Sequence, residues 1–339
     1  MYETYYGLTG KPFQLNPDPA FYFASRGHKR AFAYLQYGLH QSEGFIIVTG
    51  EIGAGKTTLI RNLLEQIDPE QLVAAQLVST QLDADDLLRA VATAIGLPAT
   101  AVDKARLLAE LEAFLVSLVP QRKRALLIVD EAQNLSARAV EELRMLSNFQ
   151  LGNQGLLQSF LVGQPELRTL MQGPQMQQLR QRVMASYHLG PMDKAETQAY
   201  VEHRLRHVGW SDNPQFEQGA FDTIFAFSAG IPRQINTLCN RLLLAAYLSE
   251  KRVIDTAHVD AIVEEITLEL SGLSVPPQEE LTVSSSKSIA DDFEDAASVF
   301  RVEARIARLE RAMSSVLRFL RPAARRFAAE SSAKRTRDG

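Results

Sequence analysis

A glycine-rich segment carries the clearest chemical signal in the sequence. It reads GEIGAGKT from Gly50 to Thr57 and fits G-x-x-x-x-G-K-[ST] in full. Such a backbone curls until its N–H groups point at phosphate oxygens, and a helix N-terminus adds partial positive charge. We predict an ATP site in which Lys56 reaches the β- and γ-phosphates and Thr57 ligates Mg²⁺. The residues expected to hold the nucleotide are Gly50, Glu51, Ile52, Gly53, Ala54, Gly55, Lys56, Thr57 and Thr58.

A second motif ends in two carboxylates. Asp130 and Glu131 follow the apolar run ALLIV at 125–129. Beside a phosphate-binding loop, an aspartate here holds Mg²⁺ through its water shell, and a glutamate can polarise the water that attacks the γ-phosphate. The alternative is an acidic strand end that caps the next helix. The continuation to Gln133 also resembles the acidic motif of superfamily 2 helicases, but the S-A-T and Q-x-x-G-R-x-x-R motifs of those enzymes do not occur in the sequence.

The hydropathy pattern indicates which elements position these groups. Apolar runs alternate with helical periodicity, which implies a parallel sheet covered on both faces. Strands are expected at 45–48, 73–78, 126–129, 157–162 and 185–189, and helices at 28–41, 56–66, 84–95, 104–118 and 137–149. Beyond Pro191 only helical patterns continue, which predicts a small all-helical second domain. These helices are expected at 195–208, 215–227, 232–249 and 256–270.

Composition excludes several classes of protein. With 46% hydrophobic and 22% charged residues, the chain has the composition of a folded globular protein. A net charge of -4 argues against a general nucleic-acid-coating protein. The single cysteine, Cys239, excludes an internal disulfide, and the six histidines show no metal-ligand spacing. Neither a membrane-spanning run nor a signal peptide is evident, so we expect a cytoplasmic location.

Several spaced motifs together resemble the AAA+ ATPases, and more narrowly the general secretion pathway protein A type. The likeness extends from residue 1 to about 270 and is closest to the secretion ATPases that accompany exosortase (PEP-CTERM) and exopolysaccharide loci. Its motifs are YYGL at 5–8, KPF at 11–13, NPDP at 16–19, FY at 21–22, GF at 44–45, DEAQNL at 130–135 and VGQPEL at 162–167.

The resemblance implies an α/β fold, in which a P-loop NTPase core with a five-stranded parallel sheet is followed by a helical lid and a C-terminal extension. The expected segments are an N-terminal arm and first helix of the ATPase module at 1–44, the α/β core at 45–191, the helical lid at 192–271, a linker at 272–290, and an amphipathic coiled-coil-like helix with a basic tail at 291–339.

The resemblance also implies roles for four polar side chains. Gln164 corresponds to a first sensor, and Arg233 to a second sensor that contacts the γ-phosphate from the lid. Arg182 corresponds to an arginine finger acting in trans on a neighbour's nucleotide, with Arg180 as the alternative. The expected catalytic set is therefore Lys56, Glu131, Gln164, Arg182 and Arg233, in a ring or helical homo-oligomer. Solvated helix charges remain the alternative for Arg180 and Arg182, and a helix-start salt bridge remains the alternative for Arg233.

The implied function is an ATPase that couples ATP binding and hydrolysis to the assembly or operation of a bacterial envelope secretion or exopolysaccharide export system. Its partner would be a component of that system. A DNA-associated ATPase of the transposition-regulator type, a pilus-biogenesis ATPase and a nucleotide switch with negligible turnover remain alternatives. Members of the secretion type often continue into a membrane span and a cell-wall-binding domain. Because this chain shows neither, cell-wall anchoring is not carried over.

The C-terminal segment shows a heptad pattern followed by a basic tail. Apolar residues recur at spacings of 3 and 4 from Val299 to Leu320, which indicates about three heptads. This helix either pairs between protomers or folds back on its own ATPase domain. From Arg318 onward basic residues outnumber acidic ones, so the tail either touches the inner membrane peripherally, contacts nucleic acid, or is a solvated end.

Overall fold

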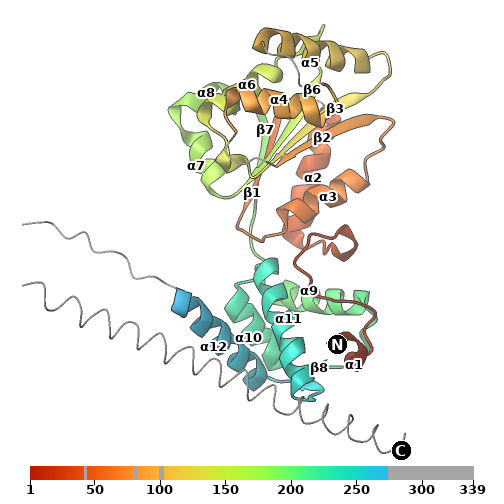
Figure 1. The fold of residues 1–339 in the computed structure, drawn as a ribbon, viewed down its shortest axis with the longest axis vertical. Coiled ribbons are helices and arrows are strands. Elements are labelled where there is room, and N and C mark those ends of the chain that lie inside the picture. The colour runs from red at the N-terminus through yellow and green to blue at the C-terminus, as the bar shows by residue number, and fades with distance from the viewer. Residues whose placement is uncertain (42–43, 79–81, 99–102, 274–339) are drawn as a thin grey trace, which may run out of the picture. The chain divides into compact units, whose positions relative to one another are not determined.

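A parallel sheet of five strands carries the phosphate-binding loop (Figure 1). The computed structural model describes residues 1–41, 44–78, 82–98 and 103–273. The strand order across the sheet is β2-β3-β6-β1-β7. The strands are β1 (Phe45–Gly50), β2 (Leu72–Val78), β3 (Arg124–Asp130), β6 (Leu157–Gly163) and β7 (Val183–Leu189). This confirms the predicted α/β fold, and each strand lies within two residues of its expected ends.

Helices cover both faces of this sheet, which is why its central strands are apolar along their whole length. Every residue of β1 and β6 is buried. Side chains alternate between the faces, so Ile47 packs under one layer of helices and Ile46 under the other. The layer over Ile46 consists of α2 (Arg26–Gln41) and α3 (Lys56–Glu65), and the layer over Ile47 includes α4 (Ala84–Ala94), α5 (Lys104–Leu118) and α6 (Ala137–Leu146).

Four helices after β7 form a second hydrophobic core in the described part of the chain. They are α9 (Lys194–His207), α10 (Gln218–Ser228), α11 (Pro232–Leu248) and α12 (Thr256–Leu273). The helix expected from residue 215 begins only at Gln218. The two residues before it form β8 (Gln215–Phe216), which pairs with β9 (Val253–Ile254). The sheet and these helices belong to one compact unit.

The N-terminal arm packs on the helical region. Helix α1 (Tyr2–Tyr6) and a 3-10 turn at Pro19–Phe21 place their aromatic side chains in the same core as α9 to α12. The buried guanidinium of Arg204 in α9 donates to the carbonyl oxygens of Pro12 and Gln14, at 2.5 and 3.4 Å. The structure thus divides the segment 1–44 between two cores, because its arm joins the helical region and α2 joins the sheet.

Several short elements complete the described fold. Helices α7 (Glu166–Gln172) and α8 (Gln177–Arg180) lie between β6 and β7, and a small hairpin joins β4 (Gln150–Leu151) to β5 (Gln154–Gly155). In the described ranges no helix has the length and apolarity needed to cross a membrane. The expected linker beyond residue 273, the heptad helix and the basic tail lie outside the described residues.

Candidate nucleotide-binding site

The predicted phosphate-binding loop joins β1 to α3. Two of its glycines combine a positive φ angle with close contacts that leave no room for a side chain. Gly53 and Gly55 have φ angles of 82° and 97°, in the left-handed region that favours glycine. A Cβ atom on Gly53 would lie 2.3 Å from Cβ of Arg233. A Cβ atom on Gly55 would lie 2.7 Å from Nε2 of His28. The loop therefore needs glycine at both positions for its curl and for close packing.

Lys56 places its ammonium group inside this curl. Its Nζ donates to the carbonyl oxygens of Gly50 and Glu51, at 2.7 and 2.9 Å. Burial lowers the pKa of Lys56, while the nearby carboxylates of Glu131 and Asp130 oppose that shift. The loop thus holds a buried ammonium group against two of its own carbonyl oxygens, and a positive charge inside a curled, glycine-rich loop is a suitable environment for phosphate oxygens.

Thr57 and Asp130 meet at the carboxyl edge of the sheet. The Thr57 hydroxyl donates to Oδ2 of Asp130 at 2.9 Å. Burial raises the pKa of Asp130, against the opposing hydrogen bonds from Thr57 and from the backbone N–H of Glu131. Hydroxyl and carboxylate oxygens suit Mg²⁺, which is usually completed by water and substrate phosphates. The described ranges hold no group of three or more His, Cys, Asp or Glu residues that could bind a metal ion.

Glu131 lies at the centre of a small polar network. Its Oε2 accepts hydrogen bonds from the side-chain amides of Gln133 and Gln164, at 2.6 and 3.1 Å. The backbone N–H of Gln164 in turn donates to Oε1 of Gln133 at 2.9 Å. Burial raises the pKa of Glu131, but these two amide donors and the charge of Lys56 outweigh it and lower the pKa overall. The carboxylate is therefore held ionised and oriented.

Gln133 was not predicted to belong to the site. It lies two residues after Glu131 in the short 3-10 turn Ala132–Asn134. The signal for Gln133 in the sequence is its place in the DEAQNL motif, which indicates a family likeness and does not by itself indicate a role for this side chain.

The helical region reaches the loop through the start of α11. The backbone N–H of Arg233 donates to the carbonyl oxygen of Gly53 at 3.2 Å. Beside this contact is a cleft of about 380 Å³, which is large enough for a small-molecule ligand. The cleft is lined by the loop, Glu131, residues 14–18 of the arm, Tyr200, Arg204 and Arg233.

The two candidate finger arginines lie at the opposite edge of the sheet. Strand β7 runs parallel to β1 with Val183 beside Phe45 and Leu189 beside Gly50. Arg182 precedes β7 and is thus separated from the loop by the length of β1, roughly 16 Å. Its guanidinium donates to the carbonyl oxygen and hydroxyl of Ser147, at 2.9 and 3.0 Å.

Arg180 bonds to the end of α7 in a similar way. Its guanidinium donates to the carbonyl oxygens of Met171 and Gly173, at 2.6 and 2.9 Å. The structure therefore places most of the predicted loop residues, Glu131 and Arg233 around one cleft. Asp130 and Gln164 do not line it and are bonded to Thr57 and Glu131, which do. Arg180 and Arg182 lie elsewhere.

Comparison with known proteins assigns this fold. Residues 39–171 match a family model described as an AAA domain. The chain belongs to the AAA+ ATPases. Over 248 residues it is 39% identical to general secretion pathway protein A of Aeromonas hydrophila, so this AAA+ ATPase is of that type. The match covers 73% of the chain and 45% of that relative, so the chain spans less than half of the relative's length.

Solved AAA+ structures of low sequence identity share the fold. The ORC2 protein of Aeropyrum pernix has a TM-score of 0.56 at 19% identity and covers 78% of this chain and 74% of its own. Cdc6p of Pyrobaculum aerophilum has a TM-score of 0.56 at 13% identity, with coverages of 72% and 67%. Drosophila ORC bound to DNA has a TM-score of 0.55 at 18% identity, with coverages of 71% and 60%. At these identities the likeness shows the fold alone.

Proposed function

We propose that this AAA+ ATPase hydrolyses ATP by a water attack that Glu131 directs. The observation that carries the proposal is the Glu131 carboxylate, ionised and fixed by two glutamine amides beside the Thr57–Asp130 pair. A carboxylate in this state can orient and polarise a water molecule. Gln164 donates to this carboxylate, so we assign it the role of holding Glu131 in place as well as sensing the γ-phosphate.

The remaining residues of the cleft bind the nucleotide. Backbone N–H groups of the loop and Lys56 would hold the phosphates, while Thr57 and Asp130 would hold Mg²⁺. When bound, Mg²⁺ neutralises charge on the phosphate oxygens. Arg233 lies at the contact between α11 and the loop, where a γ-phosphate sensor on the lid is needed.

The substitution Glu131→Gln tests this assignment. It keeps the shape of the side chain and removes the charge, so we expect nucleotide affinity to persist and turnover to fall roughly 10²- to 10⁴-fold. Binding by calorimetry and phosphate release measure the two effects separately. Glu141→Gln is the control, because Glu141 is half-exposed and pairs with Arg144 on its own helix. Turnover at the wild-type rate in Glu131→Gln would show that Glu131 is not the water-directing residue.

We further propose that ATP turnover serves a bacterial envelope secretion or exopolysaccharide export system. The similarity to general secretion pathway protein A supports this process, although less than half of that protein is matched. The enzyme would act as a ring or helical oligomer in the cytoplasm, with at most peripheral contact at the inner membrane. The Glu131→Gln form should retain its partner, so an export component should be recovered with it from cells and not with Lys56→Ala.

The competing function is a DNA-associated ATPase. Duplex DNA would then stimulate turnover several-fold, with a steep loss at higher salt. Turnover that is indifferent to DNA, together with recovery of an envelope component, favours the export function. Stimulation of turnover by DNA, without recovery of an envelope component, would favour the DNA-associated function instead.

A further inference from the structure

The residues that lead into α2 lie directly against the phosphate-binding loop, although no motif marked them. His28, the third residue of α2, is 6% exposed. Its Nδ1 lies 2.7 Å from Oγ of Ser25, and its Nε2 faces Gly55 of the loop. The backbone of Ala54, the neighbouring loop residue, partly opposes the lowering of the pKa of His28 by burial. A buried polar ring therefore supports the loop from behind.

The contacts of His28 define which nitrogen carries the proton. Nε2 faces the loop backbone at Gly55, and the backbone of Ala54 raises the pKa of the ring, so we assign the proton of the neutral ring to Nε2. In the neutral ring Nδ1 is then an acceptor, and the Ser25 hydroxyl donates to it. The same hydroxyl accepts from the backbone N–H of His28 at 3.3 Å. Because burial lowers the pKa of His28 to about 4, the neutral ring predominates at physiological pH.

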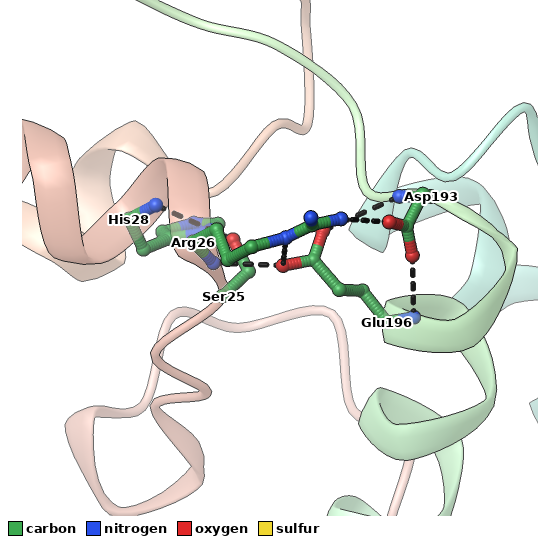
Figure 2. A network of polar contacts seen from close by, with 5 residues as sticks. All are labelled: Ser25, Arg26, His28, Asp193 and Glu196. Carbon is green, nitrogen blue, oxygen red and sulfur yellow. Dashed lines mark hydrogen bonds and ion pairs between the residues drawn. The ribbon is translucent and has the colours of Figure 1, made fainter.

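Arg26, which lies between Ser25 and His28, is bonded to two residues at the start of α9 in the helical region (Figure 2). Oε1 of Glu196 accepts from both the backbone N–H and Nε of Arg26, at 2.8 and 3.2 Å. The second oxygen of Glu196 accepts from the backbone N–H of Asp193 at 3.3 Å, and Asp193 caps α9 by accepting from Glu196 N–H at 2.8 Å. The Arg26 guanidinium also pairs with Asp193.

One carboxylate thus satisfies donors at the start of two helices. Glu196 lies near the positive end of both α2 and α9, where a negative charge is stabilising. The ion pairs of Arg26 contribute little by themselves because the Arg26 side chain is 74% exposed. The Ser25–His28 turn is instead important for its position. It contacts the backbone of the loop through His28 and the first turn of α9 through Arg26, so a shift of the turn would disturb both.

We propose that the Ser25–His28 turn is a connector that positions the phosphate-binding loop through His28 and links it to α9 through Glu196. His28 is a positioning residue, since it acts through the loop backbone. The inference rests on the proposed function, because it requires nucleotide to bind at that loop. Binding that fixes the loop backbone is then transmitted to the helical region through a single helical turn.

The loop side is tested with His28→Leu and His28→Gln in the full chain, with ADP affinity measured by calorimetry. Leucine removes the ring nitrogen that faces the loop and leaves the Ser25 hydroxyl without its partner, and we expect affinity to fall roughly 5- to 100-fold, the range for an unsatisfied buried polar group. Glutamine can donate again and should recover most of that loss. Ser25→Ala, which removes only the partner of Nδ1, should weaken binding in the same direction and serves if His28→Leu does not fold.

His203→Leu is the matched control, because His203 is a half-buried histidine of α9 that packs on Phe23. Unchanged ADP affinity in both His28→Leu and Ser25→Ala would overturn the inference while leaving the proposed function intact. Failure of the wild-type chain to bind ADP would overturn the proposed function, and the inference with it.

The helical side is tested with Arg26→Ala and Glu196→Ala, using hydrogen exchange with and without ADP. In the wild-type chain we expect ADP to slow exchange in both the loop and α9. In the two variants the protection of the loop should persist and that of α9 should fall at least twofold. Arg206→Ala is the control, because it removes an exposed ion pair to Glu202 within α9 itself. Equal α9 protection in wild type and both variants would overturn the link.

Discussion

The two edges of the central sheet differ in how they use polar side chains. At the carboxyl edge, the loop after β1 and Glu131 after β3 line one cleft, and Glu131 accepts from Gln133 and from Gln164, which follows β6. At the amino edge, the guanidinium groups of Arg180 and Arg182 donate to backbone carbonyls away from that cleft. A parallel sheet assembles a site at its carboxyl edge from one chain. A charged group at the other edge can reach a nucleotide only in a second copy.

The largest effect is expected from Arg182→Ala. If Arg182 serves a neighbour's nucleotide, turnover should fall about 10³-fold or more, because the charge at the reacting phosphate is lost. The substituted chain should still bind nucleotide with near wild-type affinity. Turnover should recover when Arg182→Ala protomers are mixed with Lys56→Ala protomers, as measured by phosphate release over a range of ratios.

Two controls distinguish an arginine finger that acts in trans from a purely structural role of Arg182 within its own chain. Ser147→Ala removes one acceptor of Arg182 and leaves the guanidinium, so turnover should stay within about threefold of wild type, the effect of one ordinary hydrogen bond. Arg180→Ala reports on the alternative finger. Absence of recovery on mixing, with oligomers present, would assign Arg182 a structural role at the amino edge.

Lys56→Ala should produce the next largest effect, at the carboxyl edge. The ammonium group that bridges Gly50 and Glu51 is lost, so we expect nucleotide affinity to fall about 100-fold, which corresponds to nearly 3 kcal/mol. Calorimetry measures the loss. Lys104→Ala, which removes an exposed ion pair with Glu142, should bind normally. Equal affinities in the two variants would contradict the assignment of the loop.

A change of pH should affect the carboxyl edge through His28. Burial lowers the pKa of His28 to about 4, whereas the unfolded chain has about 6.5. The unfolded state therefore binds a proton first, and the free energy of unfolding decreases as pH falls from 6.5 toward 4. The nearby charge of Glu196 favours the protonated ring, and the Tyr22 ring packs beside it.

The expected size of this effect is about 2 kcal/mol between pH 7.5 and pH 5. Urea unfolding of wild type and His28→Gln at both pH values measures it, since the variant should lack this contribution. The same loss of stability in both chains would show that His28 does not titrate in this way.

Arg233→Ala should have a smaller effect. The backbone bond from residue 233 to Gly53 survives the substitution, and only the side chain is lost. We expect affinity for an ATP analogue to fall about 10-fold, the value of one charge-assisted contact, with ADP affinity nearly unchanged. Arg241→Ala is the control, because Arg241 lies on the same helix as Arg233 and forms an exposed ion pair with Glu269 of α12. An equal loss of affinity for the ATP analogue and for ADP would show that Arg233 does not contact the γ-phosphate.

Local patterns were sufficient to predict the carboxyl edge. The loop motif and the apolar strands are short-range signals, and parallel pairing then brings Thr57 to Asp130 although they are 73 positions apart. The small strands β4, β5, β8 and β9 could not be predicted, because two residues show no periodicity.

The support behind the loop could not be predicted for a different reason. His28 and Glu196 are ordinary helix residues in the sequence, and their roles arise only because α2 lies behind the loop and against the start of α9. The arm likewise gave no local indication that its aromatic residues would join the helical core. Long-range contacts of this kind leave no spacing pattern in the chain.

The backbone of Glu131 has a consequence for the balance between activity and stability. This residue adopts φ 54° and ψ 38°, a conformation that costs a non-glycine residue about 1 kcal/mol. Glycine there would relieve the strain, so Glu131→Gly should melt at a higher temperature than Glu131→Ala, although both lack the carboxylate. Under the proposed role of Glu131, the chain keeps a conformationally disfavoured residue at the position that directs the attacking water, and gives up part of its folding free energy there.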